Sequence, residues 1–339
     1  MKLLEINYLR TYAILSIVAW HCFICPLSIW GLIEPSRITG YVYILGHLFI
    51  PDANMPLFTF ISGYLFVYLY LKNPNKYRVF RSFLKVKIER LLIPFLVIGT
   101  LVNITMPERY LYMILDGEGS HLWFCMMLFW CFLIRWTVLK INIKLVSLAI
   151  LIFSIMAIFS SGGNNWLFLD KSPYTLFGIR HAVYFYFFFV MGDWLYRYKS
   201  KLLNVLEGKR GWIILILTSI IYVGWALGGV SNLKYVSFLG DISSPAMFII
   251  TCYLGVLKLI SEEKLKPNSI IDTICIYSFG IYVFHEWLSW GLYHQPFFFD
   301  LFKQYTIVYA FVFTLLDFGV SFVLTHYSLK TKVGRYLLL

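Results

Sequence analysis

The chain alternates between long apolar stretches and short connecting segments rich in charged residues. Each apolar stretch is close to the ~20 residues that an α-helix needs to cross a bilayer. We expect about ten transmembrane helices, at residues 8–28, 50–71, 91–105, 121–139, 145–161, 178–197, 211–228, 243–260, 271–292 and 304–326. The pattern therefore predicts an all-α fold, a polytopic membrane helical bundle forming a single domain over residues 1–339.

Composition supports a membrane protein and excludes a soluble domain. Hydrophobic residues make up 60% of the chain and charged residues 14%, and the mean hydropathy is +0.74. The formal net charge is +12, but the basic residues gather in every second connecting segment, as in residues 72–90. Because basic loops stay in the cytoplasm, this charge predicts a topology with both termini cytoplasmic, and no nucleic-acid partner.

The cysteines offer no sign of a metal site. All six lie in apolar stretches. Cys22 and Cys25 form a lone CxxC, without a second pair or a histidine at zinc-binding spacing. We therefore expect buried thiols and no bound metal.

Two ionisable residues, Arg10 and His21, lie in the first apolar stretch, which we expect to be retained because it lacks a cleavage site. Their spacing of eleven residues is about three helical turns, so both side chains are predicted on one face, roughly 16 Å apart along the axis. Such residues in a membrane often mark function. An arginine suits a phosphate and a histidine suits general base catalysis. A snorkelling arginine and a hydrogen-bonded histidine explain the pair equally well.

Together with four later elements, Arg10 and His21 resemble acyltransferase family 3, whose members are membrane O-acyltransferases. The later elements are MPLFTFISGYLF with Ser62 and Tyr64, KIERLLIPF with Arg90, HLWFCMMLFW with His121 and Trp123, and SFGIYVFH with His285. The chain departs from the family at Asn7 and Thr11, where the family's first element has aspartate and glycine.

The resemblance implies an enzyme of a bacterial cell membrane, which moves an acyl group, usually acetyl, from cytoplasmic acyl-CoA to a hydroxyl of a cell-surface polysaccharide or its lipid-linked precursor. Acyl-CoA is then a donor substrate and not a permanently bound cofactor. His21 and Arg10 become candidate catalytic residues, and Arg10 and Arg90 become candidate ligands of the donor. His21 acts either by deprotonating the hydroxyl or by carrying the acyl group itself. The candidate acceptor-binding residues are Ser62, Tyr64, His121, Trp123, Arg180 and His285.

Structural explanations stand beside several of these assignments. Ser62 is small enough to serve close helix packing, and Trp123 fits a belt of aromatic residues at the membrane surface. His121 is equally consistent with a solvated loop, and the basic residues of 72–90 with anionic lipid. A transporter of a glycan or lipid-linked sugar is the alternative function, since it would use a similar cavity without an acyl donor.

Overall fold

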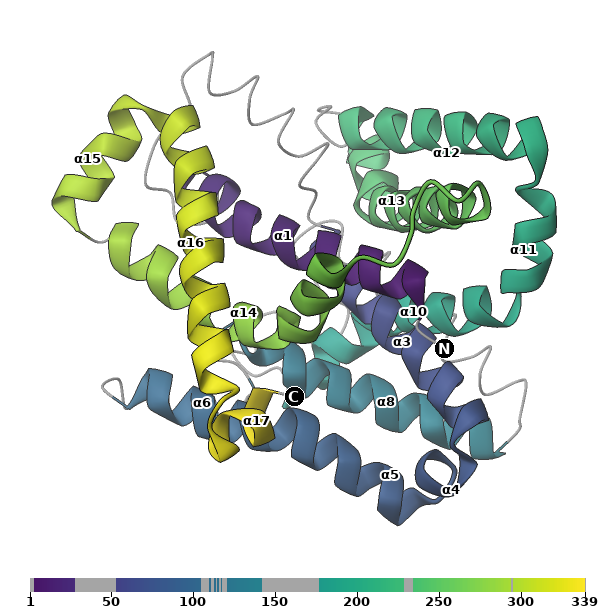
Figure 1. Ribbon diagram of the computed structural model, residues 1–339, viewed down its shortest axis with the longest axis horizontal. Helices are drawn as coiled ribbons and strands as arrows, with labels where there is room; N and C mark the ends of the chain where they lie inside the picture. The colour runs from purple at the N-terminus through teal and green to yellow at the C-terminus, as the bar shows by residue number, and fades with distance from the viewer. Residues whose placement is uncertain are drawn as a thin grey trace. The chain divides into compact units, whose positions relative to one another are not determined.

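The computed structural model describes residues 3–27, 53–104, 121–141, 177–228, 234–293 and 295–338, with single positions at 110, 113, 115 and 117. Within these ranges every regular element is helical (Figure 1). The elements are α1 (Leu4–Leu27), α3 (Asn54–Lys72), α4 (Pro74–Tyr77), α5 (Phe80–Lys87), the π-helix η1 (Ile88–Leu92), α6 (Ile93–Asn103), α8 (Trp123–Ile141), α10 (Ile179–Arg197), α11 (Lys199–Val205), α12 (Gly208–Gly228), α13 (Lys234–Ser261), α14 (Ser269–Tyr293), α15 (Pro296–Gln304), α16 (Thr306–Ser328) and α17 (Lys332–Leu338).

Each predicted span that falls on described residues corresponds to a helix. The span predicted at 145–161 lies outside the described residues. Five helical segments are long and apolar enough to cross a membrane: Asn54–Lys72, Trp123–Lys140, Gly208–Ala226, Ser243–Ser261 and Ile307–Ser328. With 11 residues, α6 is too short to cross a bilayer unaided. The chain is thus an all-helical membrane protein, and the number of about ten spans stays a prediction.

The described helices group into two compact units, which are considered separately. Unit 1 comprises Met1–Asn54 and Gly255–Leu339, and unit 2 comprises Met55–Leu254. The prediction of a single domain is not tested by this grouping.

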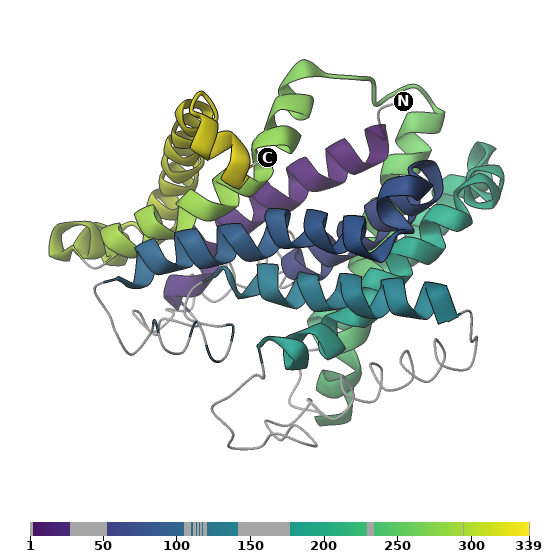
Figure 2. The same cartoon turned by 90° about the horizontal axis from the view of Figure 1, so that it is seen from below.

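In unit 1, α14 packs against both α1 and α16 (Figures 1 and 2). Asn7 contacts Asp272 and His21 contacts His285, so α1 and α14 run in the same direction. A hydrogen bond of 2.9 Å between the Tyr277 hydroxyl and His326 Nδ1 lies near the start of α14 and the end of α16, which therefore runs the opposite way. These relative directions agree with those predicted for the first, ninth and tenth spans.

In unit 2, α8 and α10 lie side by side and run in the same direction. Trp123 contacts His181 near their first residues, and Arg135 pairs with Asp193 three turns later. The two helices correspond to the predicted fourth and sixth spans, to which the charge pattern also gives one direction.

The basic segment 72–90, expected as a loop, is mostly helical, since α4, α5 and part of η1 fall within it. In α5 the side chains of Phe83 and Lys87 are buried, whereas Arg81 and Lys85 are exposed. The helix is amphipathic: one face is buried, and Lys87 lies on it with Phe83, while Arg81 and Lys85 on the other face stay in water. Hydropathy did not predict α5, because its many charged residues lower the mean hydropathy of the segment.

Candidate functional site

Two histidines from distant parts of the sequence meet inside unit 1. The ring centroids of His21 on α1 and His285 on α14 are 4.8 Å apart, with the rings edge to face at 79°. His285 is fully buried, whereas His21 is half-buried. Sequence reasoning selected both residues but gave no reason to place them together.

The position of the His285 ring is set by a hydrogen bond to its own helix. Its Nδ1 lies 2.8 Å from the Tyr282 carbonyl oxygen. Because a carbonyl oxygen only accepts, Nδ1 carries the hydrogen of this bond, and Nε2 holds the lone pair of the neutral ring. A buried imidazole fixed in this way presents a defined acceptor atom.

Arg10 and His21 share the side of α1 that faces α14. Arg10 lies close to the side chain of Cys275 on α14, about three turns of α1 before the contact of His21 with His285. Arg10 and His21 therefore lie on one face of α1, as predicted. The catalytic role of either residue stays a prediction. Arg10 is half-buried, like His21.

A buried carboxyl group lies between α1 and α16 in the same unit. The Cys22 thiol donates to Asp317 Oδ2 at 3.5 Å, and the Ser321 hydroxyl donates to Asp317 Oδ1 at 3.3 Å. These partners come from α1 and from α16 itself. The thiol of Cys22 is thus a buried hydrogen-bond donor.

The described residues contain no group of three histidine, cysteine or acidic side chains that would hold a metal ion. Among them, the cysteines with described side chains are all free thiols: Cys22, Cys125, Cys131, Cys252 and Cys275.

The remaining candidate residues belong to unit 2. Tyr64 is fully buried, with its ring centroid 5.0 Å from that of Tyr196 and 5.8 Å from that of Tyr253. Ser62 is half-buried. Tyr64 is therefore part of an aromatic cluster in which its ring packs on other rings.

His121 and Trp123 lie at the start of α8. His121 is only 6% exposed, so the interpretation as a solvated loop residue is wrong. The centroid of the Trp123 ring is 4.7 Å from that of His181, whose own helix begins beside α8. The side chain of Arg180 lies outside the described residues.

Arg90 is exposed on the π-helix η1, four residues before Pro94. Short π-helical turns occur often at functional sites, because they change which way the side chains point. Burial raises the pKa of the Tyr77 hydroxyl, and the positive charge of Arg90 partly offsets this rise.

The sequence did not indicate the ion cluster that surrounds Asp193 in unit 2. Asp193 is fully buried on α10. Arg135 Nε donates to its Oδ2 at 2.6 Å, and Arg197 Nε donates to its Oδ1 at 2.5 Å. A fully buried carboxylate needs such cations, so this cluster explains why Asp193 is tolerated.

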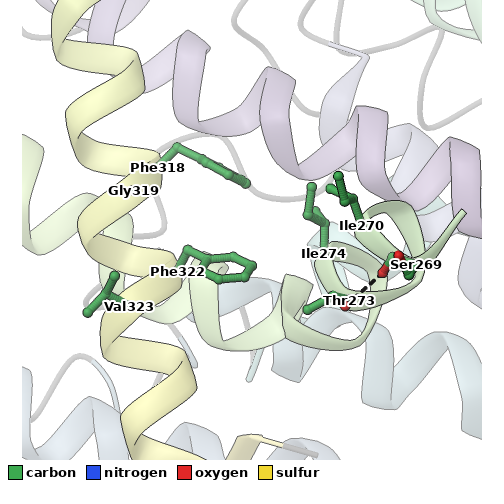
Figure 3. A pocket seen from close by; sticks show the side chains of 8 residues that line it. All are labelled: Ser269, Ile270, Thr273, Ile274, Phe318, Gly319, Phe322 and Val323. Atoms are coloured by element: carbon green, nitrogen blue, oxygen red, sulfur yellow. Dashed lines mark hydrogen bonds between the residues drawn. The ribbon is translucent and has the colours of Figure 1, made fainter.

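An apolar groove of about 510 Å³ lies between α14 and α16 (Figure 3). Its lining consists of Ser269, Ile270, Thr273, Ile274, Phe318, Gly319, Phe322 and Val323. The groove includes neither histidine of the pair nor Arg10, so it is distinct from the candidate site.

The helices and the site define a membrane-embedded helical protein with paired histidines in its interior. The family described as an acyltransferase domain matches residues 3–326, so the chain belongs to acyltransferase family 3, as the sequence resemblance predicted. This match covers residues of both units and shows a membrane acyltransferase. No curated protein and no solved structure matches the chain.

Proposed function

We propose that the protein transfers an acetyl group from cytoplasmic acetyl-CoA to a hydroxyl of a cell-surface polysaccharide, or of its lipid-linked precursor, at the bacterial cell membrane. The observation that carries the proposal is the contact between His21 and His285, whose rings lie 4.8 Å apart on two helices. Arg10 faces the same neighbouring helix at an earlier turn. Arg10 would bind the charged end of a donor that enters from one end of the helices. The two histidines, about three turns further along, would then meet its acyl group.

Coenzyme A carries several negative phosphate charges, which an arginine binds well. Arg10 and the exposed Arg90 are the proposed ligands of these phosphates. In the predicted topology both lie towards the cytoplasm, where acyl-CoA is found. The donor arrives, reacts and leaves as a substrate.

In direct transfer, His21 takes the proton from the acceptor hydroxyl as its oxygen attacks the thioester carbonyl carbon. The new C–O bond forms while the C–S bond breaks, and the departing thiolate receives the proton from His21. In the covalent route, a nitrogen of His21 attacks the carbonyl carbon and the C–S bond breaks, which releases the thiolate of coenzyme A. The acceptor hydroxyl then attacks the acyl carbon, the C–N bond to His21 breaks, and the hydroxyl proton passes to the thiolate. Both routes need one nitrogen of His21 with a lone pair.

His285 is proposed to bind the acceptor next to His21. Its Nδ1 is engaged with the Tyr282 carbonyl, which directs the lone pair of Nε2 as an acceptor for a hydroxyl. Trp123, with His181 at 4.7 Å, offers aromatic faces on which a sugar can stack. Ser62, His121 and Arg180 are further proposed contacts of the acceptor, while the burial of Tyr64 favours packing.

The transporter alternative is not favoured, because membership of an acyltransferase family implies chemistry that a transporter does not need.

The test uses purified protein with labelled acetyl-CoA and total envelope glycolipid. We expect wild type to label the glycolipid, and His21→Ala to lower the rate roughly 10²–10⁴-fold, the usual contribution of a general base. His285→Ala should lower transfer while leaving coenzyme A binding intact, and Arg10→Ala should weaken that binding in calorimetry.

His326→Gln is the matched control, since this histidine of unit 1 contacts Tyr277 and lies outside the pair. Absence of transfer by wild type, together with glycan transport that persists in His21→Ala, would contradict the proposed function.

A further inference from the structure

The first turns of α1 and α14 are joined by side-chain hydrogen bonds. Asn7 Nδ2 donates to Asp272 Oδ1 at 2.6 Å. The Tyr8 hydroxyl donates to the Lys266 carbonyl at 2.8 Å, and the Thr11 hydroxyl donates to the Ile271 carbonyl at 3.2 Å. These contacts hold the two helices in register at one end.

Arg10 belongs to this network. Its guanidinium lies close to the Cys275 side chain on α14, and Asp272 lies close to the same thiol. Cys275 in turn donates to Asn7 Oδ1 at 3.5 Å. Asn7 and Arg10 lie one turn apart on α1, as Asp272 and Cys275 do on α14, so the four side chains face one another across the two helices.

We propose that Asp272 is a positioning residue for Arg10. The inference rests on the proposed function, in which Arg10 binds the donor. A long arginine side chain near a membrane surface turns towards water unless a partner holds it. Asp272 carries the opposite charge and accepts a hydrogen bond from Asn7. Asn7 in turn accepts one from the thiol of Cys275, which lies beside Arg10.

The arrangement also bears on the departure of this chain from its family. Position 7 is asparagine, so the position three residues before Arg10 carries an amide where the family's first element has aspartate. The nearby carboxylate comes from α14 instead, and the amide of Asn7 is hydrogen-bonded to it. The carboxylate at this place therefore belongs to α14 and not to α1.

The test compares Asp272→Asn with the exchange variant Asn7→Asp/Asp272→Asn. Asp272→Asn keeps the shape of the side chain but removes the charge, and we expect the Kd for coenzyme A and the KM for acetyl-CoA to rise roughly tenfold, as for a lost hydrogen bond to a charged group. The kcat should change far less. The exchange variant keeps one amide and one carboxylate in the same contact and should recover most of the affinity.

Two further measurements separate positioning from general damage. In the Arg10→Ala background, Asp272→Asn should have little additional effect on coenzyme A affinity, because both changes act through one guanidinium. Asp300→Asn is the control, since this aspartate is exposed on α15 in the same unit. If Asp272→Asn does not fold, the exchange variant alone decides, because near-wild-type affinity supports the inference and lost affinity overturns it.

Unchanged coenzyme A affinity in Asp272→Asn, when Arg10→Ala loses it, would overturn this inference and leave the proposed function standing. An exchange variant no better than a folded Asp272→Asn would do the same. A wild-type protein that binds no coenzyme A would overturn both.

Discussion

Lys87 shows how burial changes a single ionisable residue. Its Nζ lies 3.3 Å from the centroid of the Phe132 ring and 5.9 Å from that of Tyr77. Burial, together with the smaller effect of the Lys76 charge, lowers the pKa of Lys87 from 10.5 to about 7. The aromatic rings favour the charged form, so the cost of burying the charge outweighs their attraction.

This lowered pKa predicts a pH-dependent stability. Between pH 7 and 10.5 the unfolded chain binds a proton at Lys87 that the folded protein does not hold, so the free energy of unfolding rises with pH. From pH 7 to 9 we expect a gain of about 2 kcal/mol from this residue. Thermal unfolding of wild type and Lys87→Met across this range measures it.

Lys87→Met should flatten the increase, whereas Lys85→Met should not, since Lys85 is exposed on the same helix. Parallel pH profiles for wild type and Lys87→Met would contradict the prediction.

At the scale of single residues, helical spacing was enough to place Arg10 and His21 on one face of one helix. It was not enough to place His285 beside His21, because that contact joins two helices far apart in the sequence. The burial of His121 and Lys87 also escaped prediction, since it depends on packing partners from other elements.

The crossing of α3 and α10 in unit 2 depends on two glycines. A Cβ atom at Gly63 would overlap the Phe189 carbonyl oxygen, and one at Gly192 would overlap the Phe60 carbonyl oxygen. The two backbones therefore touch directly, which is how small residues allow helices to pack in membranes.

We expect Gly63→Ala and Gly192→Ala each to destabilise the protein by about 1–3 kcal/mol, because the methyl group forces two backbones apart. Gly224→Ala on α12 is the matched control, as its Cβ would meet nothing within 4 Å. Thermal unfolding of the purified variants measures the difference. Equal midpoints for all three variants would show that the helices separate without cost.

At the scale of elements, hydropathy predicted the bounds of most helices closely. For example, the span expected at 178–197 is α10, Ile179–Arg197. Hydropathy missed α4 and α5, whose charged residues hide an amphipathic pattern. Hydropathy also did not predict the π-helical turn at η1, because composition does not distinguish the backbone hydrogen bonds of a π-helix from those of an α-helix.

At the scale of the whole molecule, the alternation of charge predicts which connections face the cytoplasm. Cysteine substitutions at Lys201 on α11 and Asp300 on α15 test it, since both positions are exposed. We expect a membrane-impermeant thiol reagent to label Asp300→Cys in intact cells. Lys201→Cys should react only after the cells are opened.

Labelling of both variants in intact cells, or of Lys201→Cys alone, would contradict the predicted topology. The relative directions of α1, α14 and α16 already agree with it, but directions within unit 1 do not say which end meets the cytoplasm. Only the distribution of basic residues carries that information.

The distance in sequence between α1 and α14 also sets an order of events during synthesis. A ribosome adds ~5–20 residues per second, so His285 emerges on the order of tens of seconds after His21. During that interval α1 lacks α14, the helix that Arg10 and His21 face. The histidine pair forms only when translation has nearly ended, so a half-made chain lacks it.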